Sequence, residues 1–238
     1  MLRFVPALAE QGRLVLEVAA TLRELAASLH PCVRVVAPGE ALSALDLECP
    51  LPSLPFALGL TLARVPEDVP YLTPDPARVA AWAARVAMLP GRRVGLAWAG
   101  NPFHVDDARR SIPPALLAPL LAVPDVSFVG LQPGRPRAAP QIHDWTADLH
   151  DFADTAALVQ TLDLTISVDS AVAHLAGALG RPVWLLNRFD TDWRWLREGD
   201  GCPWYPTLRQ FRQPAPADWP SAVAAAATCL ATWAATPT

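Results

Sequence analysis

The chain has 238 residues, of which 52% are apolar, so it can bury the core of one large domain or of two small ones. Its net charge of −4 gives no electrostatic reason to expect nucleic-acid binding, and no run of about 18 apolar residues predicts a membrane span. All 19 strongly basic residues are arginine, which excludes P-loop and Schiff-base lysines, and the four scattered cysteines form no zinc-binding pattern.

The first part of the chain alternates between helix and strand patterns. Apolar spacing predicts helices over 2–11 and 21–29, and strands over 13–18 and 33–36, with a further short strand over 46–49. This alternation is typical of an α/β protein with parallel strands.

A proline-rich stretch and a helix separate this part from the rest. Residues 50–76 have many prolines and little periodicity, a helix is expected over 77–88, and Leu-Pro-Gly at 89–91 ends it. We place a domain boundary here, which gives an N-terminal domain of residues 1–82 and a C-terminal domain of residues 83–238.

The second domain begins with two strands that end in polar loops. The strands are expected over 93–98 and 126–131, and the loops over 100–111 and 132–134. Ligands of parallel α/β sheets gather outside the carboxyl ends of the strands, so these loops are expected on one rim. A helix over 151–163 follows, with Asp154 or Thr155 as its N-cap.

The stretch from 164 to 186 has the clearest pattern in the chain. Alternating apolar residues predict a strand over 164–168, and three- and four-residue spacing predicts a helix over 171–179. Gly180 is suited to end that helix, and an apolar strand over 183–186 follows. Strand, helix and strand form a βαβ unit, which requires parallel pairing.

The polar residues at the joint of this unit suit an anion. Asp169 or Ser170 could cap the helix, and the free N–H groups there attract negative charge. Because His174 follows Ser170 by four residues, a phosphate could contact both side chains. Equally, the cap could be purely structural and the histidine bonded to its neighbours.

The last part of the chain holds an aromatic loop, a strand and a helix. Trp193, Arg194 and Trp195 could stack on a base or a sugar, or the tryptophans could hold the loop against the core. A strand is expected over 207–212, and Asp218 is expected to cap the final helix.

The stretch SVDSAVAHLAGALGRPVW resembles the nucleotide-sugar site of the heptosyltransferase-like glycosyltransferases (family nine). It is most similar to the bacterial branch that is often joined to tetratricopeptide repeats. The family pattern is Asp-Thr-small-x-x-His, which here reads Asp169, Ser170, Ala171 and His174, and Ser170 keeps the hydroxyl. The resemblance continues through GLAWAGNP, RRSIP, DFADTAAL, DWRWL and PWYPTLRQF.

This resemblance implies a GT-B fold with two Rossmann-like domains built on parallel sheets. It also implies metal-independent, inverting transfer of a sugar from a nucleotide-diphosphate donor, with no other cofactor and no bound metal. The acceptor would be a saccharide, a lipid-linked saccharide or a protein. We expect a cytoplasmic protein without a nucleic-acid partner.

The resemblance also assigns residues to the donor site. Arg110 would contact the diphosphate, Gln132 would lie near the ribose or base, and the motif residues complete the site: Asp169, Ser170, Ala171 and His174. A candidate sugar or acceptor loop contains Asp192, Trp193 and Arg194. From the residues alone, Arg110 could equally be solvated beside Arg109, and Gln132 could simply form a turn.

The start of the chain departs from the family pattern. In the family, a strand and a Gly-Asp loop that carries the candidate base precede the helix matched by residues 2–11. We therefore expect a truncated N-terminal domain. No catalytic residue can be assigned, because nothing selects among the acidic candidates Asp106, Asp107, Asp190 and Asp192.

Two other interpretations remain open. The chain could be a nucleotide-sugar-binding module without turnover, or a fragment that needs an upstream segment such as helical repeats. A dehydrogenase and a serine hydrolase are disfavoured, because the sequence has neither GxGxxG after a strand nor GxSxG.

Overall fold

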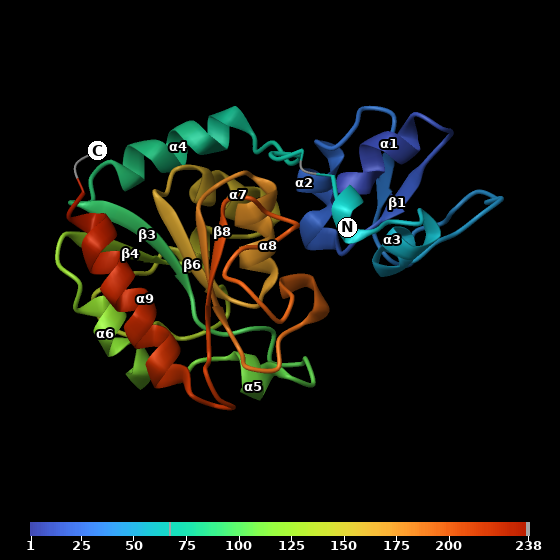
Figure 1. Ribbon diagram of the computed structural model, residues 1–238. Coiled ribbons are helices and arrows are strands. Elements are labelled where there is room, and N and C mark those ends of the chain that lie inside the picture. Colours follow the sequence, from blue (N-terminus) through green and yellow to red (C-terminus); the bar gives the residue numbers. More distant parts are fainter. Residues whose placement is uncertain (67, 237–238) are drawn as a thin grey trace.

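The computed structural model describes residues 1–66 and 68–236, and a six-stranded parallel sheet forms its centre (Figure 1). The strand order is β5-β4-β3-β6-β7-β8, and every neighbouring pair is parallel. The strands are β3 (Arg92–Ala97), β4 (Val126–Gly130), β5 (Ile142–His143), β6 (Leu164–Val168), β7 (Val183–Asn187) and β8 (Leu208–Arg212). The predicted α/β class with parallel sheets is confirmed.

Helices cover both faces of this sheet. Figure 1 shows α6 and α9 on one side and α7 and α8 on the other. The helices of this part are α4 (Pro76–Val86), α5 (Asp107–Arg110), α6 (Ala118–Leu121), α7 (Phe152–Gln160), α8 (Ala171–Ala178) and α9 (Trp219–Ala234). Short 3-10 turns lie at η5 (Pro114–Leu117), η6 (Thr146–Asp148) and η7 (Trp193–Trp195).

The central strands are apolar because both of their faces are covered. Val94, Leu96 and Ile166 have 0% exposure, and all five residues of β6 are buried. One apolar cluster includes residues of α6 and α9, and the other includes residues of α4, α7 and α8. Such a layered core holds the carboxyl ends of the strands in fixed positions.

The N-terminal part forms a second, smaller parallel sheet. Its two strands are β1 (Val15–Glu17) and β2 (Arg34–Val36). Its helices are η1 (Leu2–Phe4), α1 (Val5–Ala9), η2 (Ala20–Leu22), α2 (Arg23–Ala27), η3 (Leu51–Ser53), α3 (Leu54–Ala57) and η4 (Leu62–Arg64). The strand predicted over 46–49 is wrong: these residues are exposed coil, and Leu47 is 91% exposed. A single leucine between two acidic residues provides too little apolar surface to join a sheet.

Side-chain caps fix where the helices near the rim begin. The N-cap of α7 is Asp151, which accepts hydrogen bonds from Ala153 N at 2.8 Å and Asp154 N at 2.9 Å. The predicted cap, Asp154 or Thr155, was therefore wrong. The Asp154 carboxylate instead pairs with Arg78 at 2.9 Å. The expected cap of α9 is confirmed, because Asp218 accepts a bond from Ser221 N at 3.1 Å.

The long helix α4 connects the two parts of the chain. From α4, Arg78 forms ion pairs with Glu24 of α2 and with Asp151 and Asp154 at the start of α7. The predicted boundary between residues 82 and 83 lies inside α4, and the division into two domains stays a prediction.

Candidate functional site

A pocket of about 700 Å³ lies at the carboxyl ends of the central strands. The strand order reverses between β3 and β6, so the connections after these strands leave toward opposite faces and open a crevice between them. Polar side chains line one end of the pocket: Asp106, Arg110, Asp169, Ser170, His174, Arg188, Asp192 and Arg194. The segments after β3, β6 and β7 supply them, and the rim position predicted for the loop over 100–111 is confirmed.

The amino end of α8 faces this pocket. Ser170 has extended backbone, and its Oγ accepts a hydrogen bond from Val172 N at 3.3 Å and lies 3.0 Å from Ser167 Oγ. Ser170, not Asp169, is therefore the cap. The next residue, Ala171, is small and exposed, so a ligand can approach the first-turn N–H groups that lack helical partners.

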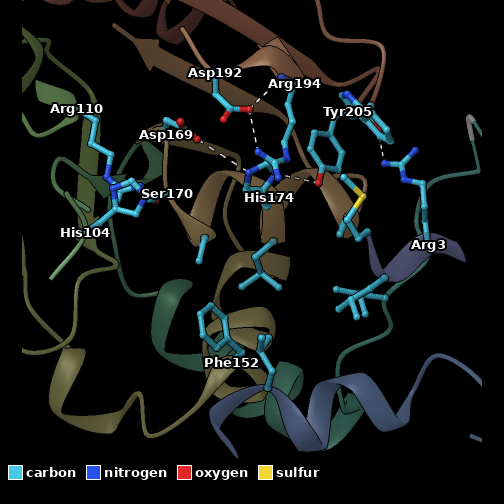
Figure 2. Close-up of a pocket in the computed structure, with 18 of the residues that line it drawn as sticks. Arg3, His104, Arg110, Phe152, Asp169, Ser170, His174, Asp192, Arg194 and Tyr205 are labelled. Atoms are coloured by element: carbon cyan, nitrogen blue, oxygen red, sulfur yellow. Dashed lines mark hydrogen bonds and ion pairs between the residues drawn. The ribbon is translucent and has the colours of Figure 1, made fainter. Parts of the chain in front are cut away.

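His174 lies one turn further along α8, beside two aromatic rings (Figure 2). Its Nδ1 lies 3.1 Å from the Tyr205 hydroxyl, and its ring stacks on Trp195 at a centroid distance of 4.8 Å. Desolvation and, to a smaller extent, the nearby positive charge of Arg194 together lower the pKa of His174 to about 3. His174 is thus a neutral hydrogen-bonding group at pH 7 and does not supply positive charge.

Two acidic residues lie near this histidine. Asp169 Oδ1 is 4.0 Å from His174 Nε2, and burial raises the pKa of the Asp169 carboxyl. Asp192 accepts bonds from Arg194 N at 3.0 Å and Arg194 Nη1 at 2.8 Å, which fixes the turn η7. Figure 2 shows Asp169, His174, Asp192 and Arg194 gathered at the same place.

The two tryptophans of the aromatic loop have different positions. Trp195 is fully buried beneath His174, so it holds the loop against the core. Trp193 is 53% exposed and contacts Trp204 edge-on. The Arg194 guanidinium lies over the Trp193 ring, 4.7 Å from the ring centre. Asp192 and Arg194 line the pocket, and a sugar contact of Trp193 stays a prediction.

Arg110 is held at the pocket by an adjacent glycine. A Cβ on Gly100 would lie 2.3 Å from Arg110 Nε, so the guanidinium rests directly on that backbone. The Arg110 side chain is only 14% exposed, and its Nε has no hydrogen-bond partner among the described residues. Arg109, in contrast, is 62% exposed and pairs with Asp190. The geometry separates the two neighbours: Arg110 lines the pocket, and its Nε forms an ion pair with Asp107 Oδ1 at 3.6 Å.

Gln132 occupies a structural position. Its Oε1 accepts bonds from Trp98 N at 2.5 Å and Ala99 N at 2.9 Å, and its Nε2 donates to Ala99 O at 2.9 Å. These hydrogen bonds fix the backbone of the residues that directly follow β3. Gln132 also lines a smaller hollow that reaches Arg110 and Ala171, so a ribose contact through its remaining N–H stays a prediction.

Sequence reasoning did not single out several residues that line the pocket, among them His104, Arg188 and Tyr205. A signal existed for Arg188, because it directly follows an apolar parallel strand and so belongs to the ligand-binding rim. No local pattern identified Tyr205, whose role depends on His174, 31 residues away.

No group of three or more His, Cys, Asp or Glu side chains in the described ranges could hold a metal ion. Within those same ranges, no helix is long and apolar enough to cross a membrane.

Comparison with known proteins relates this site to a family. The sequence profile of glycosyltransferase family 9 (heptosyltransferase) matches residues 147–187, which include α7, β6, α8 and β7. Protein FlbA of Caulobacter vibrioides is 35% identical over 191 residues. The chain is thus similar to glycosyltransferase family 9 and is a family 9-like protein. The match to FlbA covers 74% of this chain and 31% of FlbA, so the chain spans about a third of that relative. No solved structure matches it.

The six-stranded parallel sheet is consistent with a Rossmann-like fold of the GT-B type, the fold of family 9.

Proposed function

We propose that the chain binds a nucleotide-diphosphate sugar at the amino end of α8 and transfers the sugar, without a metal and with inversion, to an acceptor hydroxyl. The acceptor would be a saccharide, a lipid-linked saccharide or a protein. The observation that carries the proposal is that Arg110, whose Nε has no hydrogen-bond partner among the described residues, lines the same pocket as the amino end of α8, which lies in the stretch that matches family 9.

The chemistry requires stabilisation of the leaving diphosphate. In the proposed complex, the first-turn N–H groups of α8, the Ser170 hydroxyl and Arg110 would face the phosphates. Since these groups are already in place before the ligand arrives, they would stabilise the charge that develops on the leaving group. Neutral His174 would donate or accept a hydrogen bond, and its contact with Tyr205 would hold the ring in position.

The acceptor hydroxyl must also lose its proton. A base for this step needs a carboxylate or an imidazole within hydrogen-bond reach of the acceptor. Asp169 and Asp192 line the pocket, but Asp192 is engaged by Arg194, and the geometry assigns neither as the base. That engagement supports a second candidate function, in which the chain binds a nucleotide sugar without turning it over.

Titration calorimetry tests the donor site directly. UDP, ADP, GDP and their sugars would be titrated into the wild-type chain with EDTA present, and then into Arg110→Ala and His174→Ala. We expect micromolar binding of one nucleotide series, weakened at least tenfold in Arg110→Ala. Absence of binding by the folded wild type would overturn the proposal. Release of the nucleotide from the bound sugar donor would distinguish transfer from binding alone.

A further inference from the structure

A second arginine in the pocket has the same unsatisfied character as Arg110. Arg188 directly follows β7, and its side chain is 14% exposed, as is that of Arg110. Its Nε and Nη1 atoms are buried and have no hydrogen-bond partner in the part of the chain that the structure describes. Buried guanidinium N–H groups are normally bonded, so this position favours an additional acceptor.

Two carboxylates lie near Arg188 but outside hydrogen-bonding geometry. Asp106 Oδ2 is 3.4 Å from Arg188 Nη1, and Asp190 Oδ1 is 3.6 Å from Arg188 Nε. Asp106 belongs to the loop after β3 and Asp190 to the loop after β7, so Arg188 connects both loops across the mouth of the pocket.

Both carboxylates have another cation within reach. Arg109 Nη1 is 3.7 Å from Asp106, and Arg109 Nη2 bonds Asp190 directly. Arg188 can therefore turn away from these carboxylates without leaving either of them unpaired. Such an exchange costs much less than breaking a buried pair that has no substitute.

The surroundings of Asp169 show where Arg188 would turn. Arg110 and Arg188 both lie close enough to Asp169 to oppose the rise in its pKa that burial causes. The two arginines thus line the same pocket as Asp169 and Ser170, which follow β6 and precede α8.

We propose that Arg188 is a second diphosphate-binding arginine, which exchanges Asp106 and Asp190 for a phosphate group when the nucleotide sugar binds. The inference rests on the proposed function and deepens it. Arg110 from the loop after β3 and Arg188 from the loop after β7 would hold the diphosphate from two sides of α8. Binding would also free Asp106, and so would change the contact between the two loops.

The first test compares ligands that differ only in their phosphates. Three ligands would be used: the nucleoside diphosphate that the wild type binds, the corresponding nucleoside monophosphate, and the nucleoside itself. Each would be titrated into Arg188→Ala, Arg188→Lys and Arg109→Ala. We expect Arg188→Ala to bind the diphosphate about ten- to a hundredfold more weakly and the nucleoside unchanged. Lysine should restore part of the affinity, since it keeps the charge but not the fork. Arg109→Ala removes the substitute partner of the same carboxylates and lies outside the pocket, so it should weaken diphosphate binding less than Arg188→Ala does and leave nucleoside binding unchanged.

The second test examines the exchange itself through a double-mutant cycle. Asp106→Asn should tighten diphosphate binding about threefold in the wild-type background, because it weakens the competing ion pair. The same change should have no effect in the Arg188→Ala background. Equal tightening in both backgrounds would show general repulsion by Asp106 and would overturn the exchange.

The outcomes separate this inference from the proposed function. If Arg110→Ala weakens diphosphate binding and Arg188→Ala does not, the donor site stands and Arg188 only connects the loops. If Arg188→Ala weakens the nucleoside as much as the diphosphate, the change has disrupted the loop and the inference fails. If the folded wild type binds no nucleotide, both proposals fail together.

Discussion

His174 is the residue whose protonation differs most clearly from its ordinary behaviour. Burial holds its pKa near 3, against 6.5 for a free histidine. Between these values the unfolded chain binds a proton that the folded chain does not. The stabilising contribution of neutral His174 is therefore complete above about pH 6.5 and decreases as the pH falls toward 3.

This difference predicts how stability depends on pH. Urea unfolding should show a larger loss of stability between pH 7.5 and pH 5 for the wild type than for His174→Gln. The exposed His150→Gln serves as the control and should behave as the wild type does. In NMR spectra, the ring signals of His174 should not titrate between pH 8 and pH 5. A titration midpoint near 6.5 would contradict the depressed pKa of this half-buried ring.

Single residues also show what the sequence could and could not predict. The Asp-Ser-x-x-x-His spacing is local, so the positions of Ser170 and His174 follow from one helix and its cap. Arg188 acts with Asp106, more than 80 residues away, and Gln132 bonds to the backbone after β3. Such contacts arise only when the sheet has assembled, and no spacing within one segment encodes them.

At the scale of elements, the contact between Gly100 and Arg110 joins the loop after β3 to α5. Gly100→Ala should displace the guanidinium, since the added Cβ would lie 2.3 Å from Arg110 Nε. Because the displaced group is the end of a flexible chain, stability should change by less than about 1 kcal/mol. Affinity for the nucleoside diphosphate should fall about tenfold, toward that of Arg110→Ala, when measured by calorimetry.

Gly201→Ala is the matched control, because a Cβ there meets nothing within 4 Å. It should leave both stability and nucleotide affinity unchanged. If Gly100→Ala bound the nucleotide as tightly as the wild type, Arg110 would not depend on this glycine for its position.

The predicted helices and strands agree best with the structure where the apolar pattern of the sequence is strongest. The βαβ unit was predicted to within one residue at each boundary, because its strands are buried on both faces and Gly180 ends its helix in a left-handed conformation with φ of 69°. The strand β5 was missed, since it contains only Ile142 and His143 and so shows no period. The N-terminal strands are only three residues long, and their predicted bounds were correspondingly wide.

At the scale of the whole molecule, Arg3 joins the N-terminal part to the sheet that carries the site. It is 8% exposed, and its guanidinium lies 5.0 to 5.5 Å from the ring centres of Tyr71, Trp204 and Tyr205. It also donates hydrogen bonds to the carbonyl groups of Pro66 and Trp204. Figure 2 shows Arg3 on the far side of Tyr205 from His174.

Arg3→Met should therefore lower the free energy of unfolding by about 2 kcal/mol, because it removes the cation–π contacts and leaves buried carbonyl groups without donors. Urea unfolding measures this loss, and the exposed Arg13→Met is the control. A change below about 0.5 kcal/mol would show that Arg3 contributes little to the attachment of the N-terminal part.

The position of Tyr205 constrains how this protein can diverge. The Arg3 guanidinium lies over its ring, and its hydroxyl lies 3.1 Å from His174 Nδ1, so two residues far apart in the sequence contact the same side chain. A recombinant that joined the first 70 residues of one relative to the remainder of another would inherit a mismatched pair at this contact. Recombination between relatives should therefore give stable proteins mainly when residues 3, 71, 204 and 205 come from the same parent. Selection would then preserve these four residues as a set.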